Sequence, residues 1–248
     1  MEIIKVRNLS AGFEKRPVLK AVNFSILKDR ITVILGKSGC GKSTLLKTMV
    51  GLLPPLAGEV VFSSQKIDFN SEKSLQFLYS KVGVLFQNGA LLNSLNLYEN
   101  TALPIRMNHP NLQQVIEKEL VFSSLAKVGL FESWPKYPAE LSGGMRKRAS
   151  LARAMILDPE IIFCDEPSAG LDPITSQGLD ELMLDLKRDF GMTLVVVTHE
   201  LRSIEKIADD VIVIKDGGIL FSGPFGELFA KKDPFITTFF QAKGQNDD

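Results

Sequence analysis

Residues 36–43, which read GKSGCGKS, have the residue types and the spacing of a loop that binds phosphate. They fit the pattern GxxxxGKS, in which glycines let successive backbone N–H groups converge and a following helix adds its own unpaired N–H groups. Lys42 would supply a positive charge to the terminal phosphates, and the Ser43 hydroxyl would supply a ligand for Mg²⁺. The alternative is an ordinary glycine-rich turn. It is the weaker interpretation, because the apolar run ITVIL precedes the loop and the helix-like LLKTMVG follows it.

Two adjacent carboxylates end another apolar run, IIFCDEP at residues 161–167. A buried strand would carry both acids to its carboxyl end, where ligands bind in open α/β sheets. Asp165 could orient Mg²⁺ through water, and Glu166 could orient an attacking water or accept its proton. The alternative is an acidic strand end that only caps the next turn. His199 follows the apolar run LVVVT and would emerge at a similar position, although a single histidine is as often a surface or core residue.

A third segment, LSGGMRKRASLARAMIL at residues 141–157, has the pattern of a capped helix. Ser142 is a favourable N-cap, and Gly143 and Gly144 would let a negatively charged group approach the positive end of the helix. Taken alone, the segment predicts only an amphipathic helix with a good cap.

The first part of the chain, which must position the phosphate loop, alternates short β-rich runs with turns. It predicts a mixed sheet from the runs EIIKV, VLKAVNFSIL, ITVIL, GEVVF and VGVLF. Residues from about 98 to 156 have helical periodicity instead, with apolar positions that include Leu112, Val115, Ile116, Leu120 and Leu125. The breaks are expected at Pro104, Pro110, Pro135 and Pro138. We therefore expect a helical subdomain inserted into an α/β core.

After this insertion, strands and helices alternate, which predicts a parallel sheet. The expected strands are IIFC, LVVVT and VIVI, and helices are expected at about residues 173–190, closed by Gly191, and from about Glu200. VIVIKDGGILFSG predicts a hairpin with a glycine turn. In the tail, at about residues 224–248, the aromatic side chains of DPFITTFF could anchor an interface or equally pack as a terminal helix, and GQNDD is expected to fray.

The composition bounds the class of protein. The 248 residues, 45% of them hydrophobic, can bury a full core, so one large domain or two small lobes is expected, and residues 1–248 are treated as a single domain. Lys plus Arg and Asp plus Glu each number 29, which argues against a nucleic-acid partner held mainly by phosphate contacts. Cys40 and Cys164 do not suggest a disulfide framework, which fits a reducing, cytosolic setting. No apolar run reaches the ~20 residues that span a bilayer, and MEIIKVRNLS lacks the apolar core of a signal peptide.

Four motifs occur in a fixed order along the chain: the phosphate loop, LSGGM, the aspartate-glutamate strand end and the histidine after the next strand. In this order and at these spacings, the chain resembles the ATP-binding cassette (ABC) family over nearly its whole length. The resemblance implies the ABC-ATPase type of P-loop NTPase fold: an α/β fold with a mixed sheet core, an antiparallel β subdomain and an inserted helical subdomain. It also implies hydrolysis of ATP with Mg²⁺. In this family the signature sequence of one subunit covers the nucleotide held by the phosphate loop of the other, so one cassette per chain implies a homodimer.

The resemblance also assigns roles residue by residue. Phe13 is similar to the aromatic residue that stacks on adenine, and Gln87, in VLFQNGA, to the glutamine that senses Mg²⁺ and contacts the membrane partner. Met145 stands where glutamine is commonest in the signature, Asp172 resembles the aspartate that couples the two active sites, and His199 the switch histidine. Catalytic roles are thus expected for Lys42, Gln87, Glu166 and His199, and Mg²⁺ contacts for Ser43, Gln87 and Asp165. Nucleotide contacts are expected for Phe13, Gly36, Lys37, Ser38, Gly39, Cys40, Gly41, Lys42, Ser43, Thr44, Ser142, Gly143, Gly144 and Asp172.

Three stretches, VLFQNGALLNSL, LSGGMRKR and GLDPIT, are similar to the ATPase subunit of the Mla (maintenance of lipid asymmetry) systems, which move phospholipid between bacterial membranes. This resemblance implies an integral membrane permease that docks near residues 87–95, a periplasmic lipid-binding subunit and sometimes a small regulator with a STAS fold. It places the chain at the cytoplasmic face of the bacterial inner membrane, held there through the permease.

Two other classes stay open: a cassette for another substrate, such as lipoprotein export or amino-acid import, and a cassette ATPase outside transport. DNA-maintenance members separate their two halves with a long coiled coil, whereas only about a hundred residues lie between Gly36 and Leu141. Ribosome-acting members usually carry two cassettes in one chain. An iron-sulfur assembly ATPase is harder to exclude, although Met145 in the signature speaks against it.

Overall fold

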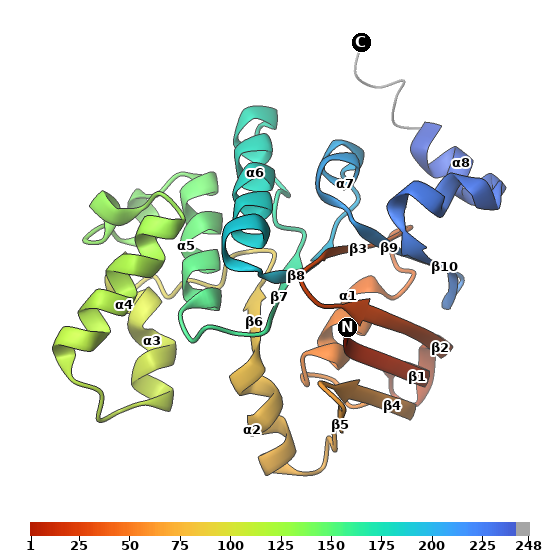
Figure 1. Ribbon diagram of the computed structural model, residues 1–248, viewed down its shortest axis with the longest axis horizontal. Coiled ribbons are helices and arrows are strands. Elements are labelled where there is room, and N and C mark those ends of the chain that lie inside the picture. The colour runs from red at the N-terminus through yellow and green to blue at the C-terminus, as the bar shows by residue number, and fades with distance from the viewer. Residues whose placement is uncertain (242–248) are drawn as a thin grey trace.

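A six-stranded sheet, in the order β10-β9-β3-β8-β7-β6, forms the centre of the computed structural model, which describes residues 1–241 (Figure 1). The predicted fraying of GQNDD therefore lies outside the described residues. The strands are β3 (Ile31–Gly36), β6 (Val82–Leu85), β7 (Ile161–Asp165), β8 (Thr193–Val197) and β9 (Asp210–Lys215), all parallel, and β10 (Gly218–Pro224), antiparallel to β9. The carboxyl ends of the parallel strands meet at one edge of the sheet, where the loops with the predicted site residues begin.

The central strand β3 is apolar along its length because both faces of the sheet are covered. Ile31, Val33 and Leu35 belong to one buried cluster, and Ile34 belongs to the other. Successive side chains of a strand point to opposite faces, so the sheet separates two hydrophobic cores.

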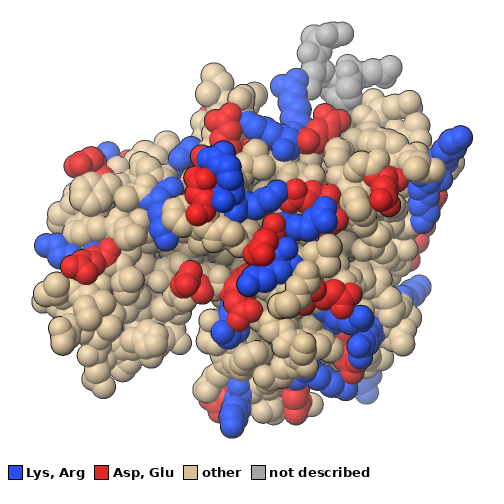
Figure 2. Space-filling model, in the orientation of Figure 1, with Lys and Arg blue, Asp and Glu red and all other residues tan. Residues whose placement is uncertain are grey.

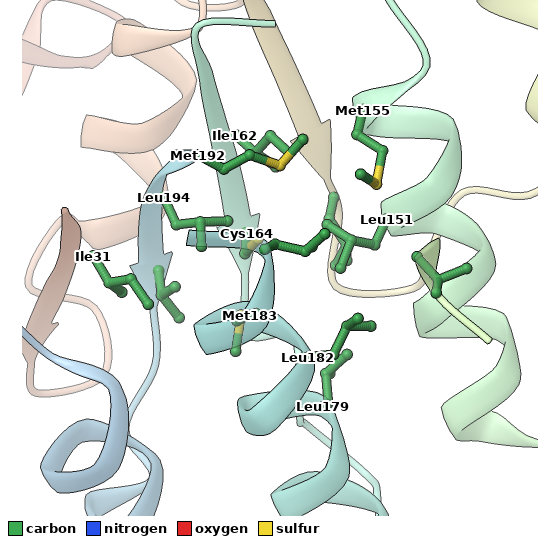
Figure 3. Close-up of a cluster of buried hydrophobic side chains, with 14 of the residues drawn as sticks. Ile31, Leu151, Met155, Ile162, Cys164, Leu179, Leu182, Met183, Met192 and Leu194 are labelled. Carbon is green, nitrogen blue, oxygen red and sulfur yellow. The ribbon is translucent and has the colours of Figure 1, made fainter. Parts of the chain in front are cut away.

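The first of these cores joins the sheet to two helices, α5 (Gly143–Met155) and α6 (Pro173–Phe190). Figure 3 shows Leu151 and Met155 of α5 facing Ile162 and Cys164 of β7, with Leu182 of α6 beside them. This contact fixes α5 relative to the strand that ends in the two carboxylates.

A second sheet is antiparallel and has the order β2-β1-β4-β5. Its strands are β1 (Glu2–Phe13), β2 (Arg16–Leu27), β4 (Ala57–Phe62) and β5 (Gln65–Lys66). The prediction that the first five β-rich runs form one sheet is therefore wrong. β1 and β2 mix buried and exposed residues and pair with each other, whereas β3 is buried throughout and pairs in parallel with β8 and β9. The predicted fold class, α/β with a mixed sheet core and an antiparallel β part, is confirmed.

Three helices lie together beside the central sheet, at the left of Figure 1: α3 (Leu97–Asn108), α4 (Gln114–Lys127) and α5. Two short 3₁₀ helices, Phe131–Ser133 and Pro138–Glu140, connect α4 to α5. The remaining helices include α1 (Lys42–Met49), α2 (Glu72–Lys81) and α7 (Leu201–Ile207). The division of a single domain 1–248 into a core and a helical subdomain at about 98–156 stays a proposal.

Pro104 lies inside α3, so the predicted break at this residue is wrong. The helix begins with a capping box, in which Asn96 and Glu99 each accept a hydrogen bond from the backbone N–H of the other. Ala102 and Ile105 are fully buried in the core. The cap and this burial stabilise the helix through a proline that would otherwise disfavour it.

The helix predicted from apolar spacing after Pro110 exists as α4, but several residues that set the spacing are exposed. Val115 is 68% exposed, and Ile116 and Leu120 are each 41% exposed, whereas Val121 and Leu125 are buried. Apolar residues occur on more than one side of this helix, so the spacing alone did not identify the side that packs.

The described part of the C-terminal tail packs on the core. It consists of a 3₁₀ helix, Phe225–Lys231, and α8 (Pro234–Gln241). Ile236 is buried in the first core, and the tail's Phe225, Phe235, Phe239 and Phe240 pack against it. A role of the tail as an interface anchor stays a prediction.

Charged side chains of both signs are interspersed on the face that Figure 2 shows. The larger uncharged areas on this face lie on the side of α3, α4 and α5. This mixed distribution matches the equal numbers of acidic and basic residues in the sequence.

Candidate nucleotide-binding site

The loop between β3 and α1 leaves backbone N–H groups without side-chain partners around a positive charge. Gly41 is the N-cap of α1, in the left-handed conformation (φ 111°), and it has no side chain to satisfy the first N–H groups of the helix. Lys42 Nζ donates hydrogen bonds to the carbonyls of Gly36 (2.8 Å) and Lys37 (3.2 Å), so the ammonium group lies within the loop. This arrangement fits a phosphate group, which accepts hydrogen bonds from N–H groups and pairs with an ammonium group.

Two positions in this loop admit only glycine. A Cβ on Gly36 would lie 2.5 Å from the Ile214 carbonyl oxygen and 2.6 Å from Cys40 Sγ. A Cβ on Gly41 would lie 2.8 Å from Leu19 Cδ2. The missing side chains thus let the loop lie directly against β9 and β2.

A cavity of about 430 Å³ opens beside the loop. It is lined by the loop, β2, the β9–β10 turn and α8, through Val18, Lys37, Ser38, Gly39, Cys40, Ile214, Lys215, Asp216, Gly217 and Phe235. Phe235 was not predicted, because only the position of the tail in the fold brings it here. Phe13 ends β1, is 53% exposed and is not among the lining residues. At the start of α1, Ser43 is exposed and Thr44 is buried.

The two carboxylates of IIFCDEP lie at the carboxyl end of β7. Glu166 has a left-handed backbone (φ 46°), and its N–H donates to the Val197 carbonyl of β8 at 2.8 Å. Burial raises the pKa of Asp165 and the Glu166 charge raises it further, whereas nearby lysines, Lys42 among them, oppose this shift. A bound cation would therefore be favourable next to Asp165.

Glu166 and His199 contact each other, with 2.9 Å between Glu166 Oε1 and His199 Nδ1. Glu166 Oε2 is buried and has no hydrogen-bond partner within the part of the chain that the structure describes. A buried carboxylate oxygen without a partner costs stability unless a ligand or water satisfies it. The geometry therefore fits a carboxylate that holds a reacting water. His199 has a side chain that is 52% exposed and so remains accessible.

Gln87 lies in the loop after β6, with an exposed side chain. Its backbone carbonyl accepts a hydrogen bond from Nζ of Lys147 on α5, which also donates to the Glu166 carbonyl at 3.2 Å. Sequence analysis missed Lys147, which is only 6% exposed. The sequence did contain a sign that Lys147 is buried. Lys147 lies four residues before Leu151 and eight before Met155, so the three residues share one face of the helix, and the other two are apolar.

The signature segment begins helix α5, and the segment that contains Asp172 begins helix α6. Ser142 caps α5, and its hydroxyl accepts a hydrogen bond from the Met145 N–H at 3.2 Å. Asp172 caps α6 and accepts hydrogen bonds from the Thr175 hydroxyl (2.5 Å) and N–H (3.0 Å), which lower the pKa of Asp172. A Cβ on Gly144 would lie 2.3 Å from Thr175 Cγ2, so the two helix starts touch.

The structure thus groups the predicted residues into two sets. One set lies at one edge of the central sheet: Lys42 begins the helix after β3, and the loops that follow β6, β7 and β8 carry Gln87, Glu166 and His199. Ser142, Gly143, Gly144 and Asp172 form the other set. Within residues 1–241, no hydrogen bond joins the signature residues to the phosphate loop.

The described residues do not form a preassembled metal site. No group of three or more His, Cys, Asp and Glu side chains in the described chain could hold a metal ion. A Mg²⁺ ion would therefore need ligands beyond such side chains, and phosphate oxygens are ligands that it commonly takes in nucleotide sites.

A loop of the phosphate-binding type at the end of a central parallel strand, with carboxylates at the end of a neighbouring strand, is the arrangement of a P-loop nucleotide-binding protein. The family model described as "ABC transporter" matches residues 19–169, and the chain therefore belongs to the ABC transporter family. The resemblance seen in the motifs is confirmed. The chain is the ATP-hydrolysing cassette of this family, whose members bind ATP, dimerise and pair with membrane permeases.

Among curated relatives, the chain is 38% identical over 240 residues to the probable ribonucleotide transport ATP-binding protein mkl of Mycobacterium tuberculosis, covering 97% of this chain and 67% of that protein. It is 37% identical over 245 residues to the intermembrane phospholipid transport system ATP-binding protein MlaF of Haemophilus influenzae, and this match covers 99% of this chain and 92% of that protein. It is also 36% identical to the methionine import ATP-binding protein MetN of Mannheimia succiniciproducens, covering 97% and 72%.

Two solved structures support the fold. The cbiO1 protein of Clostridium perfringens, part of the ABC transporter complex cbiONQ, has a TM-score of 0.85 at 28% identity and covers 97% of this chain and 95% of its own. The ATP-binding cassette MJ0796 was solved as a dimer in a post-hydrolysis state with ADP and Pi. It has a TM-score of 0.80 at 29% identity, and the match covers 90% of this chain and 98% of that chain.

Proposed function

We propose that this ATPase drives phospholipid transport by a separate membrane permease. The observation that carries the proposal is the 37% identity to MlaF, which extends over 99% of this chain and 92% of that protein. The similarity to mkl leaves about a third of that protein unmatched, and the similarity to MetN leaves about a quarter of that protein unmatched. The sequences VLFQNGALLNSL, LSGGMRKR and GLDPIT, with Met145 in the signature, support the same class.

In the proposed hydrolysis, the loop N–H groups and Lys42 bind the phosphates of ATP. Glu166 Oε2, which has no protein partner among the described residues, orients the attacking water and accepts its proton as the water oxygen bonds to the terminal phosphorus and the bond to ADP breaks. His199, 2.9 Å from Glu166 Oε1, orients this carboxylate. Positioning and charge stabilisation supply most of the catalysis in phosphoryl transfer.

The residues present also fit a Mg²⁺ ion that arrives with ATP. The exposed Ser43 hydroxyl, Asp165 and the exposed Gln87 side chain are the groups that would hold it, together with phosphate oxygens. When bound, Mg²⁺ neutralises charge that develops on the phosphates. The raised pKa of Asp165 supports this assignment, since a neighbouring cation favours its charged form.

The proposed assembly is a homodimer in which the signature segment of one copy completes the nucleotide site of the other. The similar cassette MJ0796, which was solved as a dimer, supports the dimerisation. We further propose a permease that docks near residues 87–95, where Leu92 is 46% exposed, a periplasmic lipid-binding subunit and a STAS-type regulator.

In residues 1–241, no helix has the length and apolar character to cross a membrane. The proposed location is the cytoplasmic face of the bacterial inner membrane.

A second candidate is transport of another substrate by the same motor, because mkl and MetN are about as identical to this chain as MlaF is. The substrate contacts would lie in the permease, so cassettes of similar sequence can serve ribonucleotide, methionine or phospholipid transport.

The test is to purify the complete complex with its permease and to identify copurifying lipids by mass spectrometry. Reconstituted in liposomes, the complex should move a fluorescent phospholipid when MgATP is added, and the complex with Glu166→Gln should not. ATP hydrolysis that responds to methionine or a ribonucleotide, with no phospholipid bound or moved, would replace this proposal with the second candidate.

A further inference from the structure

The first observation is a buried ammonium group between two site loops. Lys147 is 6% exposed, and its Nζ donates hydrogen bonds to the backbone carbonyls of Gln87 and Glu166. Both partners are carbonyls rather than carboxylates. Burying an ammonium group is costly unless it is hydrogen-bonded, so a lysine in this place indicates a specific role for its contacts.

The second observation is that Glu166 needs external support. Its φ of 46° lies in the left-handed region, which is unfavourable for a residue with a side chain and persists only when neighbours hold it. The N–H of Glu166 is held by Val197 of β8, and its carbonyl is held by Lys147. The two bonds together fix the peptide planes on either side of the Glu166 Cα and hence the direction of its side chain.

The third observation is that Lys147 sits on a rigid support. It lies on α5 with Leu151 and Met155, whose side chains pack in the core against β7 (Figure 3). The same helix begins at the signature residue Ser142. The ammonium group therefore has a fixed position relative to the strand that carries Glu166.

We propose that Lys147 is a positioning residue for ATP hydrolysis, whose ammonium group ties the backbone at Gln87 to the backbone at Glu166 and so aims the Glu166 carboxylate at the reacting water. The proposal rests on the role proposed above for Glu166. It predicts that Lys147 acts on the rate of the chemical step, since its hydrogen bonds go to Gln87 and Glu166 and not to the phosphate loop.

The hydrogen bonds of Lys147 give two readouts that a purely structural role would not. Lys147→Arg keeps a positive charge and N–H donors, so it should restore the contacts to the Gln87 and Glu166 carbonyls and with them most of the rate. A change in kcat with an unchanged Kd of MgADP would separate the positioning of Glu166 from a loss of nucleotide binding.

The experiment compares Lys147→Met, Lys147→Arg and Arg148→Met with wild type in the full chain. Arg148 is the matched control, because it lies on the same helix and also donates to two carbonyls, those of Val128 and Gly178, away from the site. Methionine approximates the length of lysine without its donors. ATPase rates, the Kd of MgADP and thermal unfolding are measured for each variant, and Glu166→Gln is measured in parallel.

Lys147→Met should lower kcat roughly ten- to a hundredfold, as a small misplacement of a catalytic group does, with the Kd of MgADP unchanged. Lys147→Arg should restore most of the rate, and Arg148→Met should keep the wild-type kcat. If Lys147→Met does not fold, Lys147→Gln replaces it and should lower kcat with the Kd of MgADP unchanged.

A folded Lys147→Met or Lys147→Gln variant with the wild-type kcat would overturn the proposal. A drop in kcat that Arg148→Met reproduces would do the same. The two proposals fail separately: wild-type turnover by Glu166→Gln would refute the role of Glu166, whereas an inactive Glu166→Gln beside a fully active Lys147→Met would refute only the role of Lys147.

Discussion

Helices α1 and α5 both begin at a glycine-rich turn, but they differ in what meets their first backbone N–H groups. At α1 the N-cap is Gly41, which offers no side-chain acceptor, and a cavity of about 430 Å³ opens beside the loop. At α5 the Ser142 hydroxyl accepts a hydrogen bond from the Met145 N–H. The first helix start is open to a ligand within one chain, whereas the second is capped by its own residue. The difference supports the phosphate site proposed at α1, and it fits the proposed role of α5 in a dimer, where a second chain would supply the phosphate loop.

The largest expected effect is on the chemical step and involves neither helix start. Glu166→Gln should bind MgATP as wild type does and lose turnover by on the order of 10²- to 10⁴-fold, because the amide cannot accept a proton from water. Rates of phosphate release and calorimetric ATP binding measure the two quantities. Turnover at the wild-type rate would show that the Glu166 carboxylate does not act in the reaction.

A second expected effect concerns α1 alone. Lys42→Met should weaken ATP binding roughly ten- to a hundredfold, since it removes a charge-assisted contact to phosphate that is typically worth about 1.5–3 kcal/mol. Calorimetry on the single chain measures it. Lys81→Met is the control, because Lys81 pairs with Glu160 on the protein surface. Equal Kd values for the two variants would contradict the assignment of the phosphate site to α1.

A smaller effect is expected at α5. Ser142→Ala should lower the free energy of unfolding by about 1 kcal/mol through loss of the cap. It should leave ATP binding by the single chain unchanged and reduce ATP-dependent dimer formation. Chemical denaturation, calorimetry and light scattering test the three parts. A loss of ATP affinity as large as that of Lys42→Met would remove the distinction between the two helix starts.

The smallest effect is a change in the labelling rate of a thiol. Cys40 lines the cavity beside the phosphate loop, and burial raises the pKa of its thiol, so maleimide should label it slowly near neutral pH. MgATP should protect it further. Cys164 is the internal control, because it is fully buried and burial raises its pKa to about 12. Labelling of Cys40 at the same rate with and without nucleotide would place the nucleotide away from this cavity.

Elements with strong local signals were predicted closely. The helix expected at about residues 173–190 is α6 (Pro173–Phe190), with Asp172 as N-cap and Gly191 as a left-handed C-cap. A cap, a proline in the first turn and a terminal glycine act within a few residues of each other, so the sequence shows them directly. The glycine turn before α1 is a local signal of the same kind, because Gly41 takes a left-handed conformation at the N-cap.

Features that depend on distant contacts were missed or misread. The division of the early strands between two sheets depends on β3 pairing with β8 and β9, which follow it by more than 150 residues. The exposure of Val115, Ile116 and Leu120 on α4 depends on which neighbour covers the helix. Phe235 reaches the cavity only because α8 lies there.

The sequence by itself determined the chemical groups of the proposed site: Lys42 and Ser43 in a glycine loop, two acids after an apolar strand, and a histidine after the next strand. These groups are local patterns whose conformations follow from neighbouring residues. Only the tertiary structure decided that Glu166 meets His199 and that Lys147 joins Gln87 to Glu166. Such contacts arise when parallel strands far apart in the chain bring their carboxyl ends to one edge, and no local pattern encodes that pairing.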